Sequence, residues 1–202
     1  MAQLMSSQKS EIKPMYTFDY LVFIGRFQPF HFAHMQTIEI ALQQSQNVIL
    51  ALGSAQSERN IKNPFLAIER EQMILSNFSE QDQKRIHFVH VVDVYNDEKW
   101  VKQVKDLVNA VIQPNAKVGL IGHFKDESSY YLRLFPEWQM VELDSLKDSI
   151  SATPMREAYY RGEIQTEFFP EGTIRFLSEF QKSSIYAELQ KKYLTDDRSN
   201  IE

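Results

Sequence analysis

The chain has 202 residues, of which 43% are hydrophobic and 24% charged, with a net charge of −5 and no cysteine. These values are ordinary for a folded domain of moderate size, and they exclude disordered, coiled-coil and collagen-like chains. They also exclude disulfides, thiolate metal sites and a cysteine nucleophile, and the acidic balance argues against bulk nucleic-acid binding. The composition fits a cytoplasmic location, and no apolar run approaches the roughly 20 residues of a membrane span.

Short apolar segments alternate with helical patterns over the first three quarters of the chain. Strands are predicted at residues 19–25, 47–53, 86–92, 116–121 and 138–143. Helical periodicity predicts helices at residues 32–42, 64–77, 97–112 and 127–135, the second of them capped by Asn63 with Pro64 as its first residue. Near-continuous apolar strands joined by helices predict an α/β fold, a Rossmann-like doubly wound parallel five-stranded sheet. Such sheets bind ligands at the carboxyl ends of their strands.

The pattern changes at Ser151, after which only helices are predicted, at residues 153–161, 170–182 and 184–194, with Gly162 ending the first. These helices are expected to form a subdomain rather than a second core. We therefore predict four parts: a disordered or loosely packed lead at residues 1–18, a Rossmann-like core at 19–150, a helical C-terminal subdomain at 151–194 and a frayed tail or linker at 195–202.

One dense polar cluster, GRFQPFHFAH, runs from Gly25 to His34, between the first predicted strand and the first helix. Gly25 permits a close backbone approach, and the helix start presents free N–H groups to an anion. His31 and His34 are three positions apart, so both imidazoles lie on one face of the first turn. Together with Arg26 they predict a phosphate site. The alternatives are capping or surface histidines and a metal pair, the latter weakened because no third ligand is nearby.

A second cluster, SISATPMR, spans Ser149 to Arg156 and begins another helix. Its hydroxyls and Pro154, predicted at the first helical position, suit an ordinary helix cap with a solvated arginine. Taken together with the first cluster, it predicts a second helix N-terminus that brings Ser151, Thr153 and Arg156 to the same polyphosphate.

The two clusters, in this order and at this separation, resemble the HxGH and ISSTxxR boxes of the nucleotidylyltransferase superfamily. Within it, the chain is similar to the nicotinamide mononucleotide (NMN) adenylyltransferases of the archaeal type, through GSAQ at 53–56, KNPF at 62–65, Glu69-Arg70, and Asp93 with Trp100. Three further segments look most like the bacterial branch in which this domain is fused to a Nudix hydrolase: GHFKD at 122–126, SSYYLR at 128–133 and FPEW at 135–138. The resemblance covers residues 19–182.

The resemblance implies a nicotinamide-nucleotide adenylyltransferase of NAD biosynthesis or salvage, which joins ATP and NMN into NAD and releases pyrophosphate. In-line attack of the NMN phosphate on the α-phosphorus needs positioning and charge neutralisation more than a protein nucleophile. By the same resemblance His31, His34 and Arg156 are catalytic, and they bind the ATP phosphates together with Arg26, Lys62, Lys125, Ser151 and Thr153. Mg²⁺ is the expected cofactor, held mainly by phosphates and water rather than by a protein metal site.

Nucleotide and NMN contacts are implied at Gly25, Phe27, Gln28, Gly53, Ser54, Asp93, Asp97 and Trp100. In this interpretation Asp93 accepts a hydrogen bond from the carboxamide, and the Trp100 indole stacks on the cationic pyridinium. The alternative interpretation makes Trp100 a core residue of its helix and Asp93 a strand-end cap. Three positions depart from the family pattern: Ala33 stands for the glycine of HxGH, Lys62 for an arginine and Asp97 for an asparagine.

The expected partners are small molecules, namely ATP, NMN and NAD, with no nucleic acid and no membrane, and the expected assembly is a homo-oligomer. No Nudix box occurs in this sequence, because none of its six glycines has Glu at the required spacing. The chain is therefore expected to be either a part of a longer fused protein or a single-domain member. Two other functions remain open: a related transferase acting on nicotinate mononucleotide, phosphopantetheine or FMN, and a non-catalytic nucleotide sensor.

Overall fold

The computed structural model describes residues 15–124, 127–144 and 151–199. Five strands form one sheet, namely β1 (Phe18–Gly25), β2 (Ser45–Leu52), β3 (Ile86–His90), β4 (Val118–Gly122) and β5 (Gln139–Glu142). All neighbours are parallel, in the order β3-β2-β1-β4-β5, so β1 lies at the centre and the chain crosses over between β3 and β4. The predicted doubly wound five-stranded sheet is confirmed, and the ends of β1 and β4 mark its switch point.

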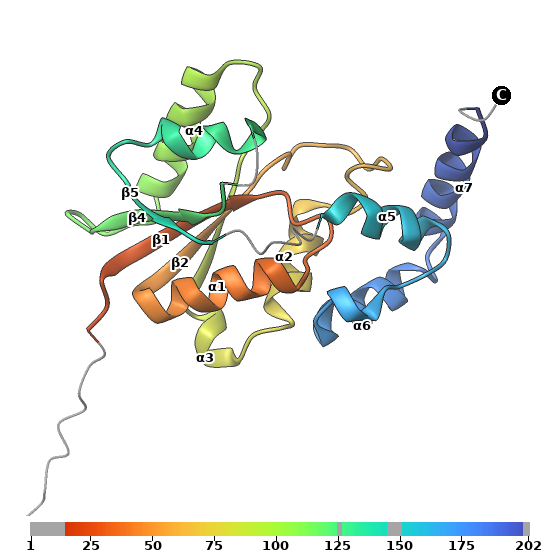
Figure 1. The fold of residues 1–202 in the computed structure, drawn as a ribbon, viewed down its shortest axis with the longest axis horizontal. Helices are drawn as coiled ribbons and strands as arrows, with labels where there is room; N and C mark the ends of the chain where they lie inside the picture. Colours follow the sequence, from red (N-terminus) through yellow and green to blue (C-terminus); the bar gives the residue numbers. More distant parts are fainter. Residues whose placement is uncertain (1–14, 125–126, 145–150, 200–202) are drawn as a thin grey trace, which may run out of the picture.

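Helices cover both faces of this sheet (Figure 1). On one face lie α1 (Phe32–Gln44), α2 (Ala67–Leu75) and α3 (Glu80–Gln83), and on the other lie α4 (Asp97–Asn109) and the 3-10 helix η1 (Glu127–Leu134). Successive strand residues point to opposite faces, so Leu21 and Phe23 pack with α1 and α2, whereas Val22 and Ile24 pack with α4. Burial on both faces explains why the strands are continuous apolar runs.

The C-terminal region is helical, as predicted, and lies beside the sheet (Figure 1). It comprises α5 (Ala152–Tyr160), the short 3-10 helix η2 (Thr166–Phe168), α6 (Glu171–Phe180) and α7 (Ser184–Ser199). Its apolar side chains join the cluster under α1 and α2; the Phe65 ring, for example, meets Phe176 and Phe180 edge-on at 5.5 and 5.0 Å. Among the helices of the described residues, none is long and apolar enough to cross a membrane.

The start of α2 differs from the prediction. This helix begins at Ala67 and not at Pro64, because the Asn60 side-chain oxygen accepts two backbone hydrogen bonds and closes the preceding residues as a turn. The cap comes from within the helix instead, since the Glu69 carboxylate accepts from the Leu66 N–H at 2.9 Å.

Two boundaries in the C-terminal region also differ. α5 begins at Ala152 with Ser151 as its N-cap, so Pro154 is the third helical residue and not the first. A proline is tolerated there because the first-turn N–H groups have no partner within the helix. α7 continues to Ser199, so residues 195–199 are helical rather than frayed. A polar sequence can extend an exposed helix without an apolar face, and the Thr195 hydroxyl donates to the Lys191 carbonyl at 2.8 Å.

Candidate active site

The loop after β1 supports the two predicted histidines with a buried aromatic ring. Phe27 has a left-handed φ of 52° and fills the space above Gly25, where a Cβ would lie 2.9 Å from Phe27 Cζ. The same ring meets the His34 ring edge-on at 4.8 Å. The Phe27 side chain is buried beneath His34, and Gly25 makes room for this ring, so the predicted nucleotide contact of Phe27 stays a prediction that only its backbone could fulfil.

His31 and His34 form a stacked pair at the start of α1. His31 is the N-cap, and the two ring centroids are 3.6 Å apart with 19° between the planes. The His31 backbone N–H donates to His34 Nδ1 at 3.3 Å. Because Nδ1 accepts this bond, the neutral His34 ring carries its proton on Nε2, which is therefore a donor. Together with the first-turn N–H groups, the pair forms a donor-rich helix terminus of the kind that binds phosphate.

A cavity of about 210 Å³, here called the histidine cavity, opens beside these rings between the ends of β1 and β4. It is lined by Phe23, Ile24, Gly25, His31, Ala33, His34, Thr37, Ile121, Gly122, His123, Ser129, Tyr131 and Leu132. Across it, the Thr37 hydroxyl donates to the Ala33 carbonyl at 2.9 Å and lies 3.3 Å from His123 Nε2, which can donate to it. Thr37 and His123 were not among the predicted site residues, and this contact joins α1 to the end of β4.

A second cavity, of about 370 Å³ and here called the cation cavity, adjoins the first along the chain, since Gly25 lines one and Arg26 the other. It is lined by Arg26, Ile61, Lys62, Thr153, Arg156, Glu157, Tyr160 and Tyr193. Three cations against one carboxylate leave an excess of positive charge that suits a polyphosphate. Burial, and next the charge of Arg26, lowers the pKa of Arg156 below its ordinary value, and a bound anion would relieve that repulsion.

Arg156 joins the two sequence clusters, although they are far apart in the chain. Its Nη1 donates to the Gln28 carbonyl at 2.7 Å and its Nη2 to the Thr153 hydroxyl at 3.2 Å. The structure thus brings Arg26, Lys62, Thr153 and Arg156 to one cavity. Ser151 is exposed at the N-cap of α5, where its hydroxyl accepts from the Thr153 N–H. Lys125, Ser149 and Ile150 lie outside the described residues.

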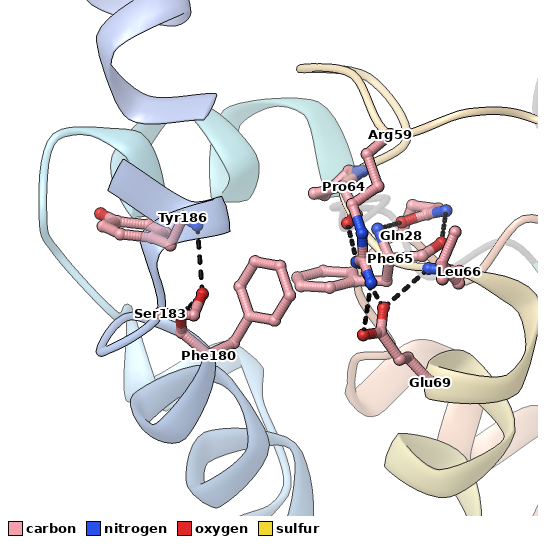
Figure 2. A network of polar contacts seen from close by, with 9 residues as sticks. All are labelled: Gln28, Arg59, Pro64, Phe65, Leu66, Glu69, Phe180, Ser183 and Tyr186. Carbon is pink, nitrogen blue, oxygen red and sulfur yellow. Dashed lines mark hydrogen bonds and ion pairs between the residues drawn. The ribbon is translucent and has the colours of Figure 1, made fainter. Parts of the chain in front are cut away.

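The Gln28 side chain is buried and bonded within the protein. It is 2% exposed, and its amide makes two bonds with the Phe65 backbone, donating to the carbonyl at 2.8 Å and accepting from the N–H at 3.1 Å (Figure 2). Its own carbonyl accepts from Arg156. The Gln28 side chain therefore has almost no surface to offer, and it ties the loop that carries Lys62 to the β1 loop; the predicted nucleotide contact of Gln28 stays a prediction.

Gly53 and Ser54 follow β2, and their backbone is held by a buried arginine. Ser54 is buried with a left-handed φ of 51°. Arg70 Nη1 donates to the carbonyls of Gly53 and Arg26, both at 2.8 Å, and the residue is 1% exposed. Burial lowers the pKa of Arg70 to about 10, against the opposing charges of Asp93 and Glu71. The sequence analysis gave Arg70 no role, although a charged residue on the buried face of α2, beside Met73 and Ile74, is a signal that was available.

Asp93, Asp97 and Trp100, the residues predicted to recognise nicotinamide, line neither cavity, although Trp100 packs on Tyr131 of the histidine cavity. Asp93 is exposed after β3, where its N–H donates to Gln56 Oε1 at 3.1 Å. Asp97 begins α4, and its carboxylate accepts from the Tyr130 hydroxyl at 2.9 Å, which raises the pKa of that tyrosine. Trp100 packs edge-on against Tyr131 and Phe135, at 5.8 and 5.9 Å, and lines neither cavity.

Comparison of the sequence with known protein families identifies the family of this chain. The profile of the cytidylyltransferase-like family matches residues 22–158, which is more than half of the chain. The fold and the site therefore define a nucleotidyltransferase-type protein, and the chain belongs to the cytidylyltransferase-like family.

Individual relatives narrow this class. The chain is 73% identical over 187 residues to the nicotinamide/nicotinic acid mononucleotide adenylyltransferase of Acinetobacter baylyi, covering 93% of this chain and 100% of that protein. It is 29% identical to the nicotinamide-nucleotide adenylyltransferase of Pyrococcus abyssi, covering 79% and 83%. Among solved structures, a bifunctional NMN adenylyltransferase/ADP ribose pyrophosphatase from Francisella tularensis, complexed with AMP and Mn ion, matches with a TM-score of 0.80 and 34% identity, covering 90% of this chain and 55% of that one. The chain is thus a member of the nicotinamide/nicotinic acid mononucleotide adenylyltransferases.

Proposed function

We propose that this chain transfers the adenylyl group of ATP to NMN, giving NAD and pyrophosphate, and that it also accepts nicotinic acid mononucleotide. One observation carries the proposal: a stacked histidine pair and a cluster of three cations adjoin at the end of β1, with Gly25 lining one cavity and Arg26 the next. This arrangement matches a nucleoside triphosphate whose α-phosphate lies by the histidines and whose β- and γ-phosphates lie among the cations.

The chemistry needs no protein nucleophile. An oxygen of the NMN phosphate attacks the α-phosphorus of ATP, and the bond from that phosphorus to the oxygen bridging to the β-phosphate breaks, releasing pyrophosphate. His31 and His34 donate hydrogen bonds to the transferred phosphate, where negative charge is redistributed in the transition state. Arg26, Lys62 and Arg156 neutralise the departing pyrophosphate. Ser151, Thr153 and Lys125 complete the phosphate contacts in this proposal.

A divalent metal fits this site only when it is bound to the phosphates of ATP. Three positive side chains and one carboxylate line the cation cavity, and no group of three or more His, Asp or Glu that could hold a metal occurs in the part of the chain that the structure describes. We therefore propose Mg²⁺ bound by phosphate oxygens and water, which suits the preference of Mg²⁺ for keeping its waters. When bound, the ion adds positive charge at the phosphates.

The acceptor is proposed to lie near Asp93, Asp97 and Trp100, after β3 and at the start of α4. An indole face favours the cationic pyridinium, and an exposed carboxylate can accept from the carboxamide of NMN. The name of the Acinetobacter baylyi relative covers both the amide and the acid acceptor, which supports dual use here. Because an aspartate repels the acid form, NMN is proposed as the better substrate.

We also propose that the chain is related to the archaeal enzymes and to the adenylyltransferase part of bifunctional proteins. It is supported by 29% identity to the Pyrococcus abyssi enzyme and 34% identity to the Francisella tularensis protein. The homo-oligomeric assembly and the cytoplasmic location stay predictions from the sequence.

The function is tested by incubating the chain with ATP, Mg²⁺ and one acceptor at a time, and by quantifying the dinucleotide and pyrophosphate. We expect equal amounts of NAD and pyrophosphate with NMN, and slower formation of the acid dinucleotide with nicotinic acid mononucleotide. FMN and phosphopantetheine serve as control acceptors and should give no product. Binding of ATP with no pyrophosphate from any acceptor would instead identify a nucleotide sensor.

A further inference from the structure

One loop brings Lys62 to the cation cavity, and it is fastened by an ion pair that lines neither cavity. Arg59 Nη1 and Nη2 donate to the two carboxylate oxygens of Glu69, at 2.6 and 2.7 Å. We propose that Arg59 and Glu69 form a positioning pair that holds Lys62 where it meets the outgoing phosphates of ATP. The proposal rests on the proposed function, because it takes Lys62 to be a phosphate ligand.

The Arg59–Glu69 pair joins the two ends of the loop that carries Lys62. Besides Glu69, Arg59 binds the Pro64 carbonyl at 2.9 Å, and Glu69 also accepts from the Leu66 N–H (Figure 2). Arg59 and Pro64 therefore bracket Lys62 on both sides in the chain, and one guanidinium holds both flanks to the first turn of α2. The planar two-bond geometry fixes direction as well as distance, which a single ammonium contact would not do.

The same loop is also held by the C-terminal helices. The Arg59 guanidinium lies over the Phe180 ring at 5.6 Å, and Figure 2 shows the Phe65 and Phe180 rings meeting edge-on. On its other side, the Tyr160 hydroxyl donates to the Ile61 carbonyl at 3.2 Å. Tyr160 lines the cation cavity, so the loop is fixed to the helix that also carries Arg156.

Lys62 itself needs such support. Its side chain is exposed, and a lysine stem has several rotatable bonds, so ordering it at a phosphate costs conformational entropy. A loop held in place leaves only the side chain to be ordered on binding, whereas a loose loop adds the backbone cost. Loosening the pair should therefore weaken ATP binding through Lys62.

Two variants separate positioning from a direct electrostatic effect. Arg59→Met removes a positive charge and Glu69→Gln removes a negative one. If Arg59 attracted ATP only by its charge, the first change would weaken ATP binding and the second would strengthen it. If the pair positions Lys62, both changes weaken it. Arg85→Met is the matched control. The side chain of Arg85 is 22% exposed, against 20% for Arg59, and it also pairs with a carboxylate, that of Asp82. It binds carbonyls near the start of β2, at the end of the strands opposite the site.

A double-mutant cycle with Lys62→Ala then tests whether the effect passes through Lys62. We expect Lys62→Ala to raise the KM for ATP about tenfold, and Arg59→Met and Glu69→Gln to raise it about three- to fivefold. Adding Arg59→Met to Lys62→Ala should raise it no further, and the Kd of inorganic pyrophosphate, measured by calorimetry, should follow the same pattern. The KM for NMN should stay unchanged throughout, and Arg85→Met should alter melting temperature but no KM.

Three outcomes would overturn the proposal. Tighter ATP binding by Glu69→Gln would show a charge effect, and a further loss when Arg59→Met is added to Lys62→Ala would show that the pair acts independently of Lys62. A wild-type KM in the Lys62→Ala single variant would remove Lys62 from the phosphate site while leaving the adenylyl transfer itself intact. Glu69→Gln keeps the size of the side chain but leaves one acceptor oxygen where the carboxylate has two, so it loosens the pair and provides the test where Arg59→Met does not fold.

Discussion

The two ends of the proposed site are built differently. The phosphate end is formed by Arg26, His31, His34, Lys62 and Arg156. Buried groups hold two of these residues in place: the Phe27 ring lies under His34, and Arg156 donates to the Gln28 carbonyl. At the acceptor end, formed by Asp93, Asp97 and Trp100, both carboxylates are exposed, and Trp100 is only partly buried. At the phosphate end His31, His34 and Arg156 are held in place before the ligand arrives, although Arg26 and Lys62 are exposed, whereas the acceptor end presents its carboxylates to solvent.

This difference has a physical reason. Charge is redistributed on the transferred phosphate, and donors fixed in advance stabilise it without reorganising during the reaction. Acceptor recognition is a matter of binding, so its groups can be ordered by the ligand itself. We therefore expect changes at the histidine pair to act on turnover, changes at Lys62 to act on the KM for ATP, and changes at the acceptor end to act on the KM for NMN.

The largest effect is expected at the histidine pair. His34→Ala should lower kcat about 10²- to 10³-fold, the loss typical of one preorganised donor to a developing charge. Steady-state kinetics with both substrates measures this, and calorimetry should show NMN binding nearly unchanged. A variant that keeps wild-type kcat would contradict the role of His34. Circular dichroism is the control, because the substitution also removes a ring that packs against Phe27 and His31.

Removing the buried cation beneath the phosphate end comes next. Arg70→Met should destabilise the fold by about 3 kcal/mol, since the carbonyls of Arg26 and Gly53 would lose their donor inside the protein. Urea unfolding gives the free energy. Arg70→Lys keeps the charge and should recover part of the loss. If Arg70→Met unfolds with wild-type stability, these two hydrogen bonds do not matter to the fold.

Trp100→Leu tests the acceptor end. It keeps an apolar side chain against Tyr131 and Phe135 but removes the indole ring. If that ring stacks on the pyridinium, binding of NMN should weaken by about 1–2 kcal/mol, the scale of a desolvated cation–π contact. The KM for ATP should not change. Lower stability with an unaltered KM for NMN would instead show that Trp100 belongs only to the apolar cluster of α4 and η1.

The smallest effect is expected from Tyr130→Phe, which removes the hydrogen bond to Asp97. Both groups are exposed, so the KM for NMN should change by no more than about twofold. The phenol of the wild-type protein should ionise above its ordinary pKa, because the Asp97 carboxylate accepts a hydrogen bond from the neutral phenol and opposes a second negative charge. The difference between the ultraviolet titrations of wild type and variant isolates the Tyr130 phenol, and a difference curve centred at the ordinary tyrosine pKa would exclude the Tyr130–Asp97 contact in solution.

Local rules explain which parts of the fold were predictable. The five strands and the flanking helices follow from apolar runs and 3.6-residue periods, and both are confirmed within a few residues. The predicted start of α2 is wrong because Asn60 accepts from the N–H groups before Pro64 and closes a turn there, whereas Glu69 accepts from the Leu66 N–H and caps the helix later. A capping pattern alone cannot say which of several polar side chains receives those hydrogen bonds.

The sequence by itself determined the chemistry at the phosphate end, since two boxes of donors at two helix starts are local patterns that suit an anion wherever they fold. Only the tertiary structure decided which of these side chains face a cavity. It turned Phe27 and Gln28 inward, and it placed Arg70 under the ends of β1 and β2. The reason is that burial and long-range hydrogen bonds depend on contacts between residues far apart in the chain, as between Arg156 and Gln28, and no local spacing encodes them.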